Sequence, residues 1–140
     1  SRSIGNSDLM DRAMQTILAC MNKSGARPVI VTGPAGAGGD APQYENGMDR
    51  LMLKILTQNL LKYPFLDQEA QERRLEMSNA DYVIVRPPRL TNGPYTGRYR
   101  IETDGLPRAA KSIARADVAD FMLKQLSDQR FVHRGVYVAR

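Results

Sequence analysis

The chain has 140 residues, of which 42% are hydrophobic and 25% charged; this is the composition of one globular domain and argues against a disordered or fibrous protein. No apolar run approaches the roughly 18 residues of a membrane-spanning helix, and we see no leader pattern, so no membrane contact is expected. The net charge is +5, and the single cysteine, Cys20, excludes an intrachain disulfide and suits the reducing cytoplasm.

The first predicted element is an amphipathic helix near residues 8–23. Ser7 is placed to cap it, Asp8 lies in its first turn, and Gly25 stands just past its end. Its apolar residues recur at helical spacing and form a stripe: Met10, Ala13, Met14, Ile17, Leu18 and Met21. Cys20 lies beside this stripe, and we expect a core residue rather than a reactive thiol.

A short buried strand, Val29 to Thr32, leads into VTGPAGAGGD at residues 31–40. These letters fit TGxxGxxG, a loop whose glycines let the backbone approach a pyrophosphate. A true dinucleotide fingerprint turns directly into a helix and reaches a second strand within about 30 residues. Here turn residues follow Gly39, and the next predicted strand begins only at Asp81. A glycine-rich loop at the carboxyl end of a strand is therefore favoured over the fingerprint, and such a loop can still line a ligand crevice.

Two helices are predicted between the glycine loop and the next strand. The first begins near Met48 and is apolar on most sides, as expected of a helix that covers a sheet. Pro64 is expected to end it, and Asp67 to cap a second helix that runs to about Ser78. Three acids of the second helix are spaced for one solvated face rather than for catalysis: Glu69, Glu72 and Glu76.

The rest of the chain alternates between strands and a helix. Strands are predicted at residues 81–86, where Pro87-Pro88 ends the ladder, at 99–103 and at 136–138. A helix between them carries an apolar stripe: Val118, Phe121, Met122 and Leu126. His133 is expected to be a solvated turn residue rather than a metal ligand, and no metal site is predicted. The alternation indicates a single α/β domain over residues 1–140, with helices on the faces of a sheet.

The positive charge is concentrated between Arg86 and Arg115. Seven cations stand there against two acids: Arg86, Arg89, Arg98, Arg100, Arg108, Lys111 and Arg115. Such a field attracts the phosphates of a cofactor or of nucleic acid, and a solvated basic face is the alternative. Nucleic acid is the less favoured partner, because Tyr95 and Tyr99 form no recognised stacking motif.

Two stretches, ADYVIVRPPRLTNGP at residues 80–94 and IARADVA at 113–119, form a fairly specific pair. Together they resemble the NAD(P)H-binding atypical short-chain dehydrogenase/reductase family, in particular its flavin reductase/biliverdin reductase B-like and NmrA-like groups. The resemblance implies a Rossmann-like doubly wound parallel sheet, of which this chain is the C-terminal portion of an NAD(P)-binding domain, without its first βαβ units. Residues 8–25 are similar to the family's fourth-unit helix, and residues 28–32 to its fifth strand.

The resemblance also implies NADP or NAD as cofactor, with two loops flanking the nicotinamide and ribose. The expected cofactor-binding residues of these loops are Thr32, Gly33, Pro34, Pro87, Pro88, Arg89 and Leu90. Arg89 is a candidate for holding a phosphate or carboxylate through its planar fork, and a surface arginine is the alternative. Thr32 is a candidate for bonding the substrate or the nicotinamide amide, against a local bond to the strand-end backbone. The pyrophosphate and adenine sites are expected outside this chain.

The chain departs from the family at the residues that carry catalysis. No tyrosine is followed four positions later by the lysine that helps a phenol give or take a proton. Flavin-reductase-like members have a serine after the fifth strand and a histidine in the proline loop, where this chain has Gly33-Pro34 and Arg89. Catalytic residues are therefore not assigned.

Two functions stay open. The chain either takes part in hydride transfer from NAD(P)H to a small aromatic or flavin-like substrate, or is a non-catalytic remnant that acts as a redox-sensing or assembly subunit. Besides a small-molecule substrate, the missing front half or another protein chain is a candidate partner.

Overall fold

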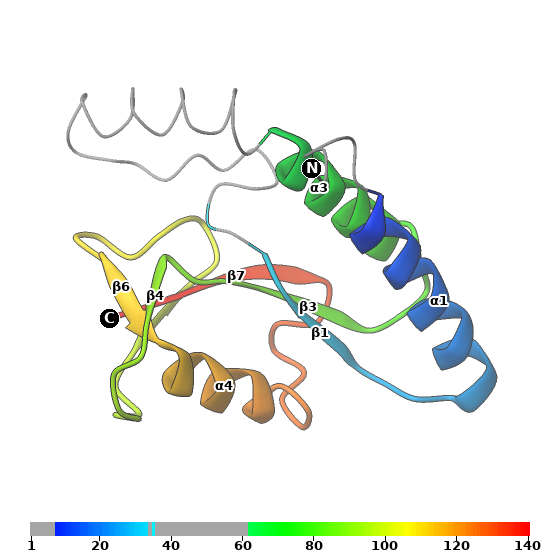
Figure 1. Ribbon diagram of the computed structural model, residues 1–140. Coiled ribbons are helices and arrows are strands. Elements are labelled where there is room, and N and C mark those ends of the chain that lie inside the picture. The colour runs from blue at the N-terminus through cyan, green and yellow to red at the C-terminus, as the bar shows by residue number, and fades with distance from the viewer. Residues whose placement is uncertain (1–7, 34, 36–61) are drawn as a thin grey trace. The chain divides into compact units, whose positions relative to one another are not determined.

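The computed structural model describes residues 8–33, 35 and 62–140, which belong to two compact units (Figure 1). One unit contains Ser1–Gly25 and Gln43–Asn79, and the other contains Ala26–Pro42 and Ala80–Arg140. The predicted cap at Ser7, the glycines after residue 35 and the helix from Met48 lie outside the described residues.

The described residues of the first unit form the helices α1 (Leu9–Ser24) and α3 (Lys62–Glu76). α1 ends as predicted: Gly25 adopts φ 73°, and its N–H donates to the carbonyl of Met21 over 2.8 Å. Met14 is fully buried on this helix. The predicted core placement of Cys20 is wrong, because this thiol is exposed. Cys20 follows Met14 by six residues, about one and two-thirds turns, and therefore lies away from the buried side of the helix.

The expected helix break at Pro64 and cap at Asp67 are wrong, because α3 begins at Lys62 and contains both residues. A proline is tolerated in a first turn, where the N–H groups have no acceptor within the helix. The Asp67 carboxylate caps the other helix instead. It accepts hydrogen bonds from the backbone N–H groups of Met10, at 3.0 Å, and Asp11, at 3.1 Å.

Charged side chains also join α1 to α3. The Asp11 carboxylate accepts two bonds from the Arg74 guanidinium, at 2.6 and 2.7 Å, and this pairing lowers the pKa of Asp11. The expectation of a solvated glutamate face is wrong for Glu72, which is buried and accepts a bond from Gln68 Nε2 at 3.5 Å. Glu76 is exposed, as expected. A buried polar side chain is stable only when its hydrogen bonds are made, which spacing along a sequence does not reveal.

The second unit is built on a four-stranded sheet. Three strands run parallel and the fourth, at one edge, is antiparallel. In spatial order they are β1 (Val29–Thr32), β3 (Tyr82–Arg86), β7 (Arg134–Ala139) and β5 (Arg100–Glu102). This mostly parallel arrangement is Rossmann-like and confirms the α/β fold class predicted from the sequence.

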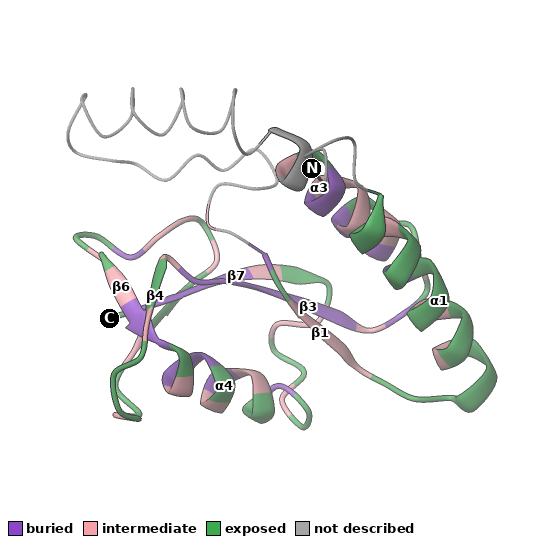
Figure 2. Cartoon of the chain, in the orientation of Figure 1, coloured by how far each residue is buried: buried purple, intermediate pink, exposed green. Residues whose placement is uncertain are grey.

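The core of this unit lies between the sheet and helix α4 (Arg115–Lys124), as Figure 2 shows by the buried positions of β3, β7 and α4. Every residue of β3 is buried, as expected of an inner parallel strand. The core cluster consists of Val83, Val85, Ile113, Val118, Phe121, Val136 and Val138. Val83 and Val85 alternate with Ile84, so they share one face of the sheet.

A second, two-stranded ladder was not predicted. It pairs β4 (Arg89–Thr91) with β6 (Ser112–Ala114) in parallel. The sequence indicated only a loop after Pro88 and no strand before α4. In these two segments no alternation extends beyond the three paired residues, unlike the run at residues 99–103, so only the partners across space define the strands.

Candidate functional site

Two chain segments far apart in the sequence meet at the carboxyl edge of the sheet. Because β1 and β3 are parallel neighbours, with Thr32 opposite Val85, both strands end at the same edge. The N–H of Gly33 donates to the carbonyl of Val85 over 2.9 Å, which fixes the start of the glycine segment against the end of β3. Pro87 follows β3 directly. Open α/β sheets bind ligands outside this edge, near the carboxyl ends of their strands.

The predicted cofactor-binding residues differ in exposure. Gly33 and Pro87 are buried and Pro88 is half-buried, so these residues shape the backbone of the edge. The exposed side chains are Thr32, Arg89 and Leu90. Pro34 lies outside the described residues. The edge therefore offers a ligand one hydroxyl, one guanidinium and one apolar side chain.

A buried carboxylate holds the loop that follows β4. Asp117 of α4 is 1% exposed and accepts bonds from the N–H of Thr96 at 2.8 Å, its hydroxyl at 2.8 Å and the N–H of Gly97 at 2.9 Å. Burial acts to raise the pKa of Asp117, but these bonds outweigh it and the pKa is lowered. Gly97 adopts φ 65°, and an added Cβ would stand 2.9 Å from the Tyr95 hydroxyl, so the loop needs glycine there.

The two stretches that carry the family resemblance are linked by further contacts. The Arg115 guanidinium donates to Asn92 Oδ1 over 2.6 Å, and the Thr91 hydroxyl donates to the carbonyl of Ile113 over 3.3 Å. The Arg-Ala-Asp stretch thus fixes the loop of residues 91–97. Sequence reasoning did not assign this role to Asp117, although an acid beside the apolar residue Val118 on a helix was the available signal.

The structure brings a tyrosine and a lysine together in a way that the spacing test was unable to detect. Lys124 Nζ donates to the Tyr99 hydroxyl over 3.2 Å, and that hydroxyl donates to Asp120 Oδ2 over 2.7 Å. Burial and the bond to Asp120 raise the pKa of Tyr99, which makes its phenol a weaker acid. A catalytic tyrosine needs the opposite shift, so we interpret these contacts as a clasp between α4 and the residue before β5.

Arg86 is a buried cation at the end of β3. Sequence reasoning did not predict that it lies against Gly135. An added Cβ at Gly135 would lie 2.9 Å from Arg86 Nε, so the absence of a side chain at Gly135 makes room for the arginine on the neighbouring strand. The signal was an arginine closing the apolar run Tyr82–Val85.

The amino end of the sheet carries His133, which is 53% exposed in its side chain and lies 3.7 Å from Asp81 Oδ1. This agrees with the expected solvated turn residue. Within residues 8–33 and 62–140, no three His, Cys, Asp or Glu side chains gather as a metal site would require. In the same part of the chain, no helix combines the length and the apolar character needed to cross a bilayer.

Comparisons with known proteins agree on the family and the fold. The sequence model of the family described as NAD(P)H-binding matches residues 2–129. No curated protein gives a significant match.

Three solved structures illustrate the likeness in fold. A short-chain dehydrogenase/reductase from Veillonella parvula, solved in complex with NADP, is 22% identical with a TM-score of 0.72, and the match covers 96% of this chain and 60% of that one. ChuY from Escherichia coli CFT073 is 21% identical with a TM-score of 0.70, over 92% and 60%. ChuY of Escherichia coli O157:H7, described as an anaerobillin reductase, is 18% identical with a TM-score of 0.69, over 98% and 61%. The chain therefore spans about 60% of the length of these structures.

Proposed function

Because this chain belongs to the NAD(P)H-binding family, we propose that it works as part of an NAD(P)H-dependent oxidoreductase that transfers hydride to a small aromatic or flavin-like substrate. The observation that carries the proposal is the family match over residues 2–129. Two neighbours support it: the Veillonella protein holds NADP, and the Escherichia protein is named a reductase.

The chemistry of the carboxyl edge fits the nicotinamide end of such a cofactor. The exposed hydroxyl of Thr32 suits a carboxamide, and the exposed guanidinium of Arg89 suits a phosphate, while Leu90 offers apolar contact to a flat ring. The cofactor supplies the hydride when it is bound. The residues of this chain orient it, and the buried backbone at Gly33 and Pro87 keeps the two loops in register with their strands.

The second candidate is a non-catalytic NAD(P)-binding subunit. It is favoured by the missing tyrosine and lysine spacing and by Gly33-Pro34 and Arg89 at the positions where related reductases carry a serine and a histidine. Such a protein would keep the fold and the binding edge while lacking turnover.

A turnover assay separates the two candidates. The loss of NADPH or NADH absorbance is followed with riboflavin as a neutral acceptor. We expect catalysed oxidation, and Thr32→Val should lower kcat/KM roughly two- to tenfold through the lost hydrogen bond. Thr103→Val, which follows β5, is the matched control and should leave the rate unchanged.

If Thr32→Val and Thr103→Val change kcat/KM by the same factor, Thr32 does not belong to the site. Binding of the nicotinamide cofactor without any flavin reduction would favour the non-catalytic subunit.

A further inference from the structure

We infer that a group of exposed cations at the carboxyl edge binds an acid group on the substrate, distal to the ring that accepts hydride. This inference rests on the proposed function, because it assigns a second part of the same substrate site. The group, called here the cationic strip, consists of Arg89, Arg100, Arg108 and Lys111.

Strand pairing brings the cationic strip together from four places in the sequence. Arg89 of β4 stands opposite Ser112 of β6, and Lys111 directly precedes Ser112, so both cations lie at the start of this ladder. The end of β7 meets the same point, since the N–H of Arg140 donates to the carbonyl of Ser112 over 3.2 Å.

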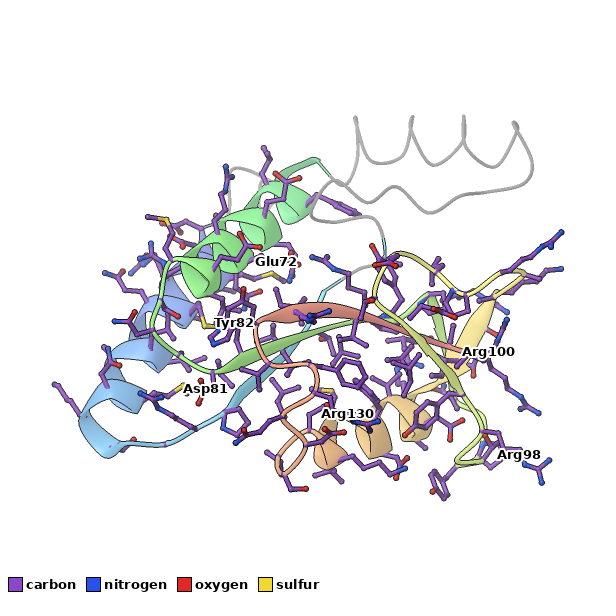
Figure 3. All side chains as sticks on the ribbon, turned by 180° about the vertical axis from the view of Figure 1, so that it is seen from behind. Glu72, Asp81, Tyr82, Arg98, Arg100 and Arg130 are labelled. Carbon is purple, nitrogen blue, oxygen red and sulfur yellow. The ribbon has the colours of Figure 1, made fainter. Side chains whose placement is uncertain are left out.

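Arg100 and Arg108 join the cationic strip through β5. Arg100 stands opposite Ala139, the last residue of β7, and its guanidinium donates to the carbonyl of Arg108 over 2.8 Å. Figure 3 shows Arg100 at this end of the sheet, with Asp81 and Tyr82 at the opposite end.

No carboxylate in the described part of the chain neutralises the cations of the strip. Three other cations of this unit do form ion pairs: Arg27 with Asp81, Lys124 with Asp120 and Arg130 with Asp128. Among the described residues, none of the four cations of the strip forms an ion pair. Like charges held side by side repel one another, so a bound anion would relieve the repulsion as well as gain charge-assisted hydrogen bonds.

The cationic strip adjoins the proposed ring site without coinciding with it. Arg89 belongs to both, because it begins β4 directly after Pro88, whereas Arg100, Arg108 and Lys111 lie farther along the same edge. A substrate whose aromatic ring lies near Thr32 and Leu90 would thus direct an acidic tail toward the strip. Phosphate and carboxylate tails share the required chemistry.

The test compares two flavins that share one ring system. FMN carries a terminal phosphate and riboflavin does not, and binding of either to the full chain is measured by flavin fluorescence without any turnover. We expect FMN to bind about tenfold more tightly at low salt, because exposed charge contacts each contribute modestly and several act together. The difference should shrink as salt is added.

Substitutions assign the preference to the cationic strip. Arg89→Gln and Lys111→Gln should each weaken FMN binding roughly two- to fivefold, and together should remove most of the preference for FMN over riboflavin. Lys111→Gln should leave riboflavin binding unchanged, because Lys111 lies outside the ring site. Arg134→Gln is the control, since this exposed arginine starts β7 at the opposite end of the strand. Equal binding of the two flavins, binding of neither, or an equal effect of Arg134→Gln would overturn the inference.

Nicotinamide mononucleotide tests the other source of phosphate. If the cationic strip serves the cofactor instead, this mononucleotide will lose affinity in the Arg89 and Lys111 variants while the FMN preference persists, and the inference fails. If FMN is preferred in a charge-dependent way but NAD(P)H is not oxidised, the proposed function is contradicted and the anion site is supported.

Discussion

Asp117 shows what the Arg-Ala-Asp stretch of the family motif does in the fold. The sequence predicted a helix through this position and recognised the Arg-Ala-Asp stretch, but not that the carboxylate would be buried and satisfied by backbone N–H groups 20 and 21 residues earlier. Such contacts depend on loop conformation, which residue spacing does not encode. Asp117 therefore fixes the loop after β4 at Thr96 and Gly97.

We predict that Asp117→Asn lowers stability most at neutral pH. The folded state lowers the pKa of Asp117 below its ordinary value of 3.8, so the stabilisation is present above that value and is lost as the pH falls through the folded-state pKa. Thermal unfolding between about pH 7 and pH 3 should show wild type and variant converging on acidification. Asp104→Asn, at an exposed acid beyond β5, should follow wild type throughout. If the difference in melting temperature between Asp117→Asn and wild type grows as the pH falls, this account is contradicted.

At the scale of elements, segments with a distinct local pattern were predictable, and features that depend on contacts across space were not. The helix ending at Gly25, the strand at residues 29–32 and the buried strand before Pro87 lie where the sequence places them. The start of α3 was misplaced, because Pro64 and Asp67 read as a break and a cap whereas the fold uses Asp67 on another helix. Nothing in a local pattern identifies a cap that comes from 56 residues away.

We predict that Asp67→Ala destabilises the protein by about 1 kcal/mol, with a range of roughly 0.5–2 kcal/mol, the usual cost of losing a helix cap. The loss should be local at first, because the N–H groups of Met10 and Asp11 lose their acceptor. Urea unfolding measures the free energy of unfolding. The substitution should accelerate amide hydrogen exchange more in the first turn of α1 than in its last turn. Glu76→Ala, an exposed acid on the same helix, is the control. If the two variants unfold alike, the cap contributes nothing to stability.

At the scale of the whole molecule, the α/β class followed from the alternation of elements, and the Rossmann-like sheet from the resemblance. The structure and the family match agree with both. The cofactor site remains a prediction, since the pairing of β1 with β3 brings Thr32 and Pro87 to one edge but no contact within the chain reports on a ligand. The chain also spans only about 60% of the length of its structural neighbours.

The final prediction concerns how much of a dinucleotide this chain recognises. Pyrophosphates are held where a glycine-rich turn leads from a strand into a helix, and within the described residues no strand does so; the link between β6 and α4, Ala114 to Arg115, contains no glycine. The described edge instead suits the nicotinamide half. We therefore expect reduced nicotinamide mononucleotide and NADPH to bind the chain with dissociation constants within about threefold of each other, since the adenylate half adds few contacts. Calorimetry with both ligands measures this ratio, and adenosine 2′,5′-bisphosphate is the control that should not compete. If NADPH bound more than about 100-fold more tightly, a pyrophosphate site would have to exist in this chain, and the glycines at residues 36, 38 and 39 would become its first candidates.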